Sequence, residues 1–182
     1  MPRRILIIAT DGFEQSELTG PRSRLEQAGH TTIIASPESG KIKGWNKDDW
    51  GDEVKVGMKL EDAEAKDFDA LLLPGGQMNP DRLRLERKVP QIIRDFLDQG
   101  KPVAAICHAP WLLAEAGVIA GKTVTAWPSI RKDLANAGAN VIDNKVVVDG
   151  KIITSRMPDD IPAFSDALLR ALEDQLELPE PA

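Results

Sequence analysis

Short runs of consecutive apolar residues alternate along the chain with segments that are apolar at helical spacing. The runs predict buried strands, because a parallel sheet is covered on both faces and its strands do not alternate in polarity. Apolar positions that recur every three or four residues predict amphipathic helices. We expect strands within 3–10, 30–36, 69–76, 103–107 and 123–128, and helices within 21–29, 89–99, 108–117, 129–138 and 161–176.

This alternation predicts an α/β fold, with a mostly parallel sheet that carries helices on both faces. Two β-rich runs flank Asp149-Gly150, a dipeptide typical of a two-residue turn, so we expect a small antiparallel hairpin within 146–156. The polar segment 38–60 ends in an alternating pattern that favours a short hairpin or edge strand. We expect a single domain over residues 1–182, with a frayed tail at 178–182.

Composition and charge exclude several classes of protein. The net charge of −6 argues against nonspecific binding to nucleic acid or to anionic membranes. The apolar run near the N-terminus, Ile5 to Ala9, is too short for a signal peptide or a membrane span. The single cysteine cannot form an intrachain disulfide. We therefore expect a cytoplasmic protein that works without a membrane or a nucleic acid partner.

Cys107 lies where a buried strand pattern changes into a helix pattern. A sharp turn from strand to helix presents the nucleophile of many hydrolases, and it needs small neighbours such as Ala105 and Ala109. Pro110 suits the first turn of the helix that follows. Backbone N–H groups at a helix N-terminus lower the pKa of a thiol, so we expect a reactive thiolate here. A lone cysteine can also be a small buried hydrophobe, but this position favours a nucleophile.

Three loops should converge on Cys107, because ligands bind outside the carboxyl ends of parallel strands. They bring the carboxyl of Glu14, the pair Gly75-Gly76 and His108 to the thiol. Glycines allow backbone N–H groups to approach a substrate oxygen, as an oxyanion hole requires. Each feature is common in isolation: glycine pairs form turns, and a loop glutamate is usually solvated. Only their convergence indicates a site.

Several details remain open at this stage. Adjacent side chains in such a turn point apart, so a direct contact between Cys107 and His108 is not required. Trp111 and Trp127 could line an apolar pocket or pack in the core. The sequence contains no cluster of metal ligands and no dinucleotide or phosphate-binding glycine motif, so we expect neither a metal nor a cofactor.

Taken together, these motifs resemble the ThiJ/PfpI superfamily. They are FEQSEL at 13–18, LLLPGG at 71–76, AICHAP at 105–110, TAWPSI at 125–130 and VVVDG with TSR at 146–156. The similarity covers Ile5 to about Leu172 and is strongest with the PfpI-type branch, whose members include intracellular proteases and general stress proteins and which is related to the Parkinson-associated deglycase. The resemblance implies a flavodoxin-like three-layer α/β/α sandwich, as in class I glutamine amidotransferases.

The resemblance also implies a role for each residue of the site. Cys107 matches the family nucleophile, Glu14 the carboxylate that hydrogen-bonds its sulfur, and His108 the histidine that follows it. Gly75 and Gly76 match the oxyanion region. In the protease proposal a neighbouring subunit supplies a glutamate to complete a Cys-His-Glu triad, which implies a homodimer or larger homo-oligomer. Here the acid would be Asp81, which is one methylene shorter.

Three functions are consistent with these residues. The first is a thiol-dependent hydrolase of the stress response that acts on methylglyoxal and its early adducts, with Glu14 moving a proton at the sulfur. The second is a peptidase that uses Cys107, His108 and Asp81. The third is a redox sensor or chaperone-like stress protein, in which Cys107 is oxidised rather than used for turnover.

Overall fold

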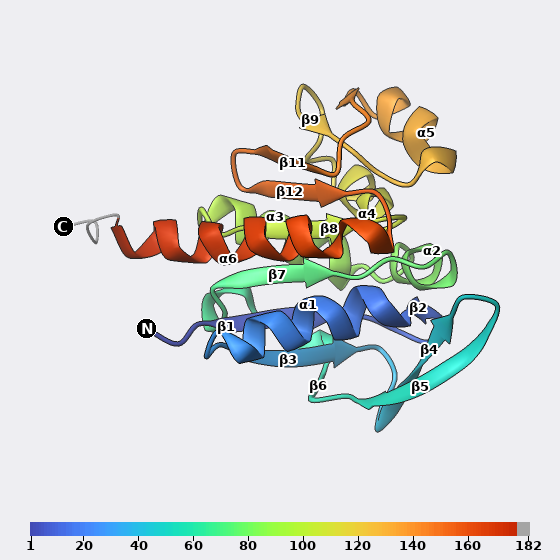
Figure 1. Ribbon diagram of the computed structural model, residues 1–182, viewed down its shortest axis with the longest axis vertical. Coiled ribbons are helices and arrows are strands. Elements are labelled where there is room, and N and C mark those ends of the chain that lie inside the picture. The colour runs from blue at the N-terminus through green and yellow to red at the C-terminus, as the bar shows by residue number, and fades with distance from the viewer. Residues whose placement is uncertain (178–182) are drawn as a thin grey trace.

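The structure, a computed structural model that describes residues 1–177, is built on a seven-stranded sheet (Figure 1). The strands are β1 (Arg4–Ile8), β3 (Thr31–Ser36), β6 (Met58–Lys59), β7 (Ala70–Leu73), β8 (Val103–Ile106), β11 (Val146–Asp149) and β12 (Ile152–Ser155). Their order across the sheet is β11-β12-β8-β7-β1-β3-β6. All neighbours run parallel except β11 and β12, which form the antiparallel hairpin expected around Asp149-Gly150.

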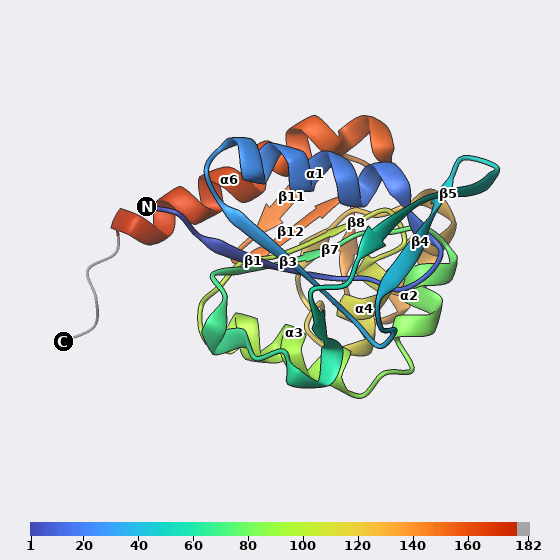
Figure 2. The ribbon, with the colours of Figure 1, turned by 90° about the horizontal axis from the view of Figure 1, so that it is seen from below.

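Helices cover both faces of this sheet, as Figure 2 shows in side view. On one face lie α1 (Gln15–Gln27) and α6 (Ile161–Glu177), side by side. On the other lie α2 (Met78–Leu83), α3 (Lys88–Asp98) and α4 (Pro110–Glu115), with α5 (Arg131–Asn136) packed against α4. The expected three-layer, flavodoxin-like arrangement is therefore confirmed.

Each face of the sheet has its own hydrophobic core. Along β1, Ile5 and Ile7 belong to the core under α1 and α6, whereas Leu6 and Ile8 belong to the core under α3 and α4. All four side chains are fully buried. Successive side chains of a strand point to opposite faces, so only a continuous apolar run can fill both cores. This is why the apolar runs of the sequence mark the central strands.

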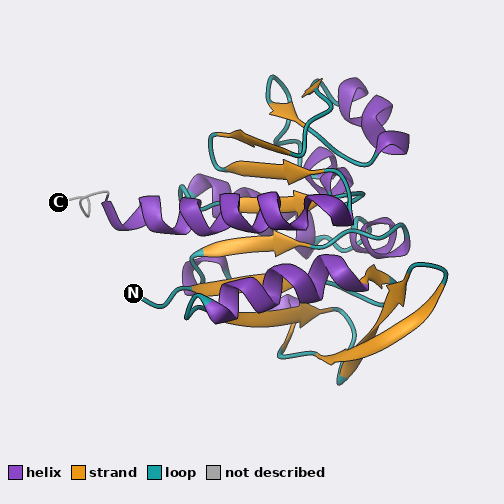
Figure 3. Cartoon of the chain, viewed as in Figure 1, coloured by secondary structure: helices purple, strands orange, loops and turns teal. Residues whose placement is uncertain are grey.

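Two smaller sheets extend the molecule at its edges (Figure 3). One contains β2 (Phe13–Glu14), β4 (Lys41–Asn46) and β5 (Asp49–Lys55), of which β4 and β5 form an antiparallel hairpin. The other pairs β9 (Thr123–Val124) with β10 (Asn140–Val141). Short 3-10 turns occupy Leu60–Asp62, Ala65–Asp67, Pro128–Ile130 and Pro158–Asp160. Within residues 1–177, no helix has the length and apolar character that crossing a membrane requires.

The first helix begins earlier in the chain than its sequence predicts. The prediction that it begins near Pro21 is wrong, because α1 begins at Gln15 and includes Pro21 in its interior. Proline favours a first helical turn, so on local preference alone it marks a helix start. The short α2 was not predicted, and the strand expected at 123–128 is only the two residues of β9. The tail expected to fray, 178–182, lies outside the described residues.

Candidate active site

The three loops expected to converge do so at the carboxyl edge of the sheet. They follow β1, β7 and β8, which are neighbours in the strand order. A cavity of about 290 Å³ opens at this edge and contains the side chain of the only cysteine. It is lined by Glu14, Glu17, Trp45, Lys47, Gly76, Gln77, Cys107, His108, Trp127 and Pro158.

Cys107 occupies the sharp turn between β8 and α4. Its φ angle is +65°, in the left-handed region that non-glycine residues rarely adopt. Two backbone hydrogen bonds fix the turn: Cys107 N donates to Ser155 O at 3.0 Å, and Trp127 N donates to Cys107 O at 2.9 Å. Strain of this kind persists where the surroundings enforce it, typically at functional sites. The predicted strand-to-helix turn is confirmed.

The carboxyl group next to the Cys107 sulfur belongs to Glu17, not to Glu14. Glu17 is fully buried in the first turn of α1, and its Oε2 accepts a hydrogen bond of 2.9 Å from Gly75 N. Glu14 precedes the helix, lines the same cavity and is only partly buried. The prediction that Glu14 contacts the sulfur is wrong, because α1 begins earlier than expected and turns Glu17 inward.

A signal for Glu17 was present in the sequence. The apolar residues Leu18, Pro21 and Leu25 follow Glu17 at intervals of one, four and eight residues, which places all four on one side of a helix. All four are buried in the structure. A charged residue on the buried face of an amphipathic helix is uncommon and suggests function. The chain itself also covers Phe13, Leu18 and Pro21, so these side chains form no exposed apolar surface around Glu14.

Gly75 and Gly76 allow the loop after β7 to approach the thiol closely. A Cβ atom on Gly75 would lie 2.6 Å from Ile106 O and 2.7 Å from the Cβ of Cys107. Gly76 has a φ of +88°, and a Cβ there would lie 2.7 Å from Gly12 O and from Glu14 N. The backbone N–H groups of Gly76 and His108 donate hydrogen bonds to the Cys107 sulfur. The same donors could stabilise negative charge on sulfur or on a substrate oxygen beside it.

His108 contacts the thiol directly, with 3.2 Å between its Nδ1 and the Cys107 sulfur. Its ring lies between two tryptophans: Trp127 stacks on it at a centroid distance of 5.7 Å, and Trp111 meets it edge-on at 5.4 Å. Burial lowers the pKa of His108, which keeps the imidazole neutral and able to accept a proton at pH 7. The tryptophans therefore hold a potential base against the nucleophile.

Asp81 and Trp111 lie beside the cavity rather than in it. Asp81 is exposed on α2 and lines a separate hollow with Gln77, Met78 and Trp111. The Nε1 group of Trp111 donates to Asp133 at 2.9 Å, and the guanidinium of Arg84 lies over its indole ring. Of the predicted aromatic residues, only Trp127 lines the cavity with Cys107. No hydrogen bond joins Asp81 to His108 within the described chain.

Burial has the dominant effect on the two acidic groups of the site. Burial, and then the charge of Glu14, raise the pKa of Glu17 from its ordinary value of 4.5 to about 8. Burial, and then the charge of an ionised Glu17, also raise the pKa of the Cys107 thiol, although the N–H groups of Gly76 and His108 oppose this. The expectation of a lowered thiol pKa is therefore wrong while Glu17 is ionised. A thiolate can form only when Glu17 keeps its proton, so the two groups titrate as a pair.

The paired titration predicts how the reactivity of Cys107 depends on pH. The rate of alkylation by iodoacetamide should rise as the pair loses its first proton, near the Glu17 pKa of about 8. In Glu14→Gln the midpoint should move to lower pH, because the negative charge that raises the Glu17 pKa is gone. Glu26→Gln, a change to an exposed acid farther along α1, should leave the midpoint in place. An unchanged midpoint in Glu14→Gln would show that the Glu14 charge does not reach the pair.

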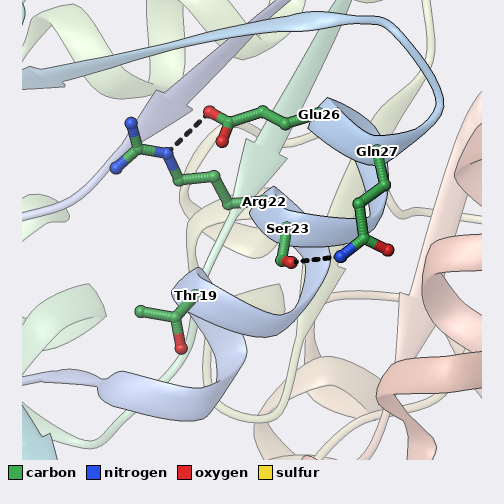
Figure 4. A pocket seen from close by; sticks show the side chains of 5 residues that line it. All are labelled: Thr19, Arg22, Ser23, Glu26 and Gln27. Atoms are coloured by element: carbon green, nitrogen blue, oxygen red, sulfur yellow. Dashed lines mark hydrogen bonds and ion pairs between the residues drawn. The ribbon is translucent and has the colours of Figure 1, made fainter.

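A larger hollow, of about 490 Å³, lies on the outer face of α1 and has no connection with this chemistry. Figure 4 shows that its lining side chains all belong to that helix, with Arg22 paired to Glu26 and Ser23 bonded to Gln27. The fifth, Thr19, donates its hydroxyl to the backbone carbonyl of Gln15. The cavity at Cys107 is therefore the better candidate for a site.

The chain is similar in sequence to several known proteins. A profile of the DJ-1/PfpI family matches residues 3–171. Protein/nucleic acid deglycase 2 of Escherichia coli (strain K12) is 43% identical over 173 residues, which are 94% of this chain and 99% of that protein. General stress protein 18 of Bacillus subtilis (strain 168) is 43% identical over 175 residues, 95% of this chain and 99% of that protein. Deglycase PfpI of Pyrococcus furiosus is 42% identical over 170 residues, which are 93% of this chain and 99% of that protein.

Solved structures show the same likeness. DJ-1beta of Drosophila melanogaster superposes with a TM-score of 0.82 at 28% identity and covers 98% of this chain and 100% of its own. A two-domain protein from Anabaena variabilis, which contains DJ-1/ThiJ/PfpI-like and ferritin-like domains, superposes with a TM-score of 0.89 at 35% identity. The match covers 98% of this chain and 50% of the Anabaena chain.

Proposed function

Because this chain belongs to the DJ-1/PfpI family, we propose that it is a cytoplasmic cysteine-dependent hydrolase that removes reactive carbonyl damage, with methylglyoxal and its early adducts as substrates. The relatives named deglycase support this reaction class, and the relative named general stress protein supports a role in stress. The observation that carries the proposal is the placement of one strained cysteine against a neutral imidazole, a buried carboxyl and two backbone donors.

The chemistry begins with attack of the Cys107 thiolate on the aldehyde carbon. A bond forms between sulfur and carbon, and the electron pair of the carbonyl double bond moves to oxygen, which takes up a proton. The N–H groups of Gly76 and His108 lie where the negative charge develops. With methylglyoxal, transfer of hydrogen from the aldehyde carbon to the neighbouring carbon gives a thioester of lactate, which water hydrolyses to lactate and the free thiol.

Glu17 and His108 are the groups that can move protons in this sequence. Glu17 holds a proton near neutral pH because its pKa is raised to about 8, and its carboxyl lies at the sulfur. His108 is neutral and in contact with the same sulfur. One group can donate while the other accepts, which general acid–base catalysis requires. In this proposal Glu17 takes the role predicted for Glu14.

The test is release of lactate from methylglyoxal by the purified protein, compared with Cys107→Ala. We expect turnover by the wild type and none by the variant. A matched control is Lys43→Gln, an exposed change on β4 that should leave turnover unaltered. Equal lactate release by the wild type and Cys107→Ala would refute the proposal.

The peptidase alternative depends on a second copy of the chain. Among residues 1–177 no hydrogen bond or ion pair joins Asp81 to His108, so its carboxylate would have to reach the imidazole from a neighbouring subunit. The structure leaves room for this: no described residue forms a hydrogen bond with Nε2 of His108. We retain a homodimer or larger homo-oligomer as part of this alternative. Casein cleavage that is lost in both Cys107→Ala and Asp81→Asn would favour it over carbonyl hydrolysis.

A further inference from the structure

The tip of the β4–β5 hairpin brings a lysine to the cavity that holds Cys107. Asn46 of β4 pairs with Asp49 of β5, so the turn between them contains only Lys47 and Asp48. Lys47 has a φ of +61°, and it is one of two non-glycine residues among 1–177 with a positive φ; the other is the nucleophile. Glycine or asparagine ordinarily occupies such a position. A lysine in this conformation destabilises the turn, and residues strained in this way are typical of functional sites.

The hairpin tip is held in place by contacts on both of its strands. Nε1 of Trp45 donates to Lys47 O at 2.8 Å, and the ring of Trp50 packs edge-on against that of Trp45. The Gln15 side chain bonds the backbone and the side chain of Asp52, which ties β5 to the start of α1. Lys47 is therefore fixed at its base, while its four-carbon stem leaves the ammonium free to reach a ligand.

Of the residues that the structure describes, Lys47 is the only one that brings a cationic side chain to the lining of this cavity. No carboxylate oxygen of the described residues lies within 4.0 Å of the Lys47 ammonium, so Lys47 forms no ion pair among them. Lys41 on the same hairpin, in contrast, pairs with Glu53. Glu14, the partly exposed acid of the cavity, also lacks an ion pair within the described chain. Glu14 and Lys47 therefore form no ion pair with each other, although both line the cavity. An unpaired ammonium beside an apolar cavity is suited to an anionic group of a ligand.

We infer that Lys47 determines substrate preference: it selects reactive carbonyl compounds that carry a carboxylate. The aldehyde carbon would lie at Cys107, the apolar part of the molecule between Trp45 and Trp127, and the carboxylate at Lys47. This inference names the substrate class for the proposed function and rests on it. Lys47 acts by binding and takes no part in the bond changes at sulfur.

The first experiment measures binding preference without requiring turnover. Iodoacetate and iodoacetamide both alkylate a thiolate: a bond forms between sulfur and the methylene carbon, and iodide leaves. They are similar in size, and only iodoacetate carries a charge. Both react with the same thiolate, so the ratio of their rates at Cys107 cancels any change in the thiol pKa and reports the charge around the site.

We expect Lys47→Gln to lower the ratio of iodoacetate to iodoacetamide rates by about threefold to tenfold, the effect of one partly screened charge at close range. Lys47→Arg should retain the wild-type ratio. Lys43→Gln, which removes an exposed charge on β4 outside the cavity, should also retain it. The difference between wild type and Lys47→Gln should shrink in 1 M salt, because exposed charges are then screened. An equal ratio in wild type and Lys47→Gln would overturn the inference.

Lys47→Asn tests whether the loss of preference comes from the lost charge or from a disturbed fold. Asparagine tolerates the left-handed conformation, so this variant should be at least as stable as the wild type and still lose the preference for iodoacetate. A second experiment measures turnover of two substrates, phenylglyoxal and its para-carboxylated derivative. In Lys47→Gln the KM for the carboxylated compound should rise, while the KM for phenylglyoxal and both kcat values stay constant. If the wild type converts neither compound, the proposed function fails, and the alkylation ratio still decides whether Lys47 binds anions.

Discussion

Glu17→Gln is expected to make the protein more stable at pH 7 and nearly inactive. Glu17 titrates at about 8 in the folded protein and at its ordinary value of 4.5 when exposed. Because the folded pKa is the higher one, the contribution of Glu17 to stability is complete below pH 4.5 and is lost as the pH rises through about 8. Each pH unit between the two values costs about 1.4 kcal/mol, so at pH 7 the cost is about 3 kcal/mol.

Glutamine removes this cost because it does not titrate. Its amide oxygen can accept the hydrogen bond from Gly75 N, and its NH₂ group can donate to the sulfur, so the packing is retained. The amide cannot release a proton to the reaction, and turnover should fall by about a hundredfold or more. A buried acid that destabilises the fold and serves the chemistry is a trade-off between stability and activity.

Urea unfolding of wild type and variant at pH 4.5 and pH 7 measures the first effect. The variant should be more stable by about 3 kcal/mol at pH 7 and by little at pH 4.5. Glu26→Gln on the same helix is the control, and we expect it to lower the stability at pH 7 rather than raise it. Burial is the largest single effect and raises the pKa of Glu26, but the hydrogen bonds from Thr32 and Arg22, together with the Arg22 charge, hold this pKa below its ordinary value. A Glu17→Gln variant no more stable than wild type at pH 7 would mean that Glu17 is ionised in the folded protein.

The sequence was sufficient to predict the parts of the fold that depend on burial. Apolar runs located β1, β7 and β8, because a strand covered on both faces has no polar positions. Once these strands are parallel neighbours, their loops must meet at one edge, which is why the convergence at Cys107 could be predicted. The turn at Asp149-Gly150 was predicted for a local reason, the backbone angles that Asp and Gly tolerate.

The sequence was insufficient where tertiary contacts override local preference. Pro21 indicates a helix start, yet packing against the sheet carries α1 through it from Gln15. That single error assigned the role of Glu17 to Glu14. The position of Lys47 depends on where the β4–β5 hairpin folds relative to α1, a contact between distant segments that no local pattern encodes. The pKa of Cys107 was misjudged because burial and the charge of a neighbour outweigh the helix N-terminus.

The second large effect is expected for Gly76→Ala. Alanine at a φ of +88° is strained, and its Cβ would lie 2.7 Å from the backbone atoms Gly12 O and Glu14 N, which cannot move without shifting the loop after β1. We expect a loss of about 2 to 4 kcal/mol in the free energy of unfolding. Gly29→Ala is a matched control, since Gly29 has a φ of +89° with no atom within 4 Å of the added Cβ. It should cost only about 1 kcal/mol.

The same substitution should affect the chemistry, because Gly76 N donates to the Cys107 sulfur. Displacing the loop moves this donor away from the developing negative charge, and turnover of methylglyoxal should fall by about a hundredfold, as for loss of one oxyanion donor. Gly29→Ala should turn over methylglyoxal like the wild type. The measurements are urea unfolding and lactate release at a temperature where both variants are folded. If Gly76→Ala matched Gly29→Ala in stability and the wild type in turnover, the close approach of this loop to the thiol would have no part in catalysis.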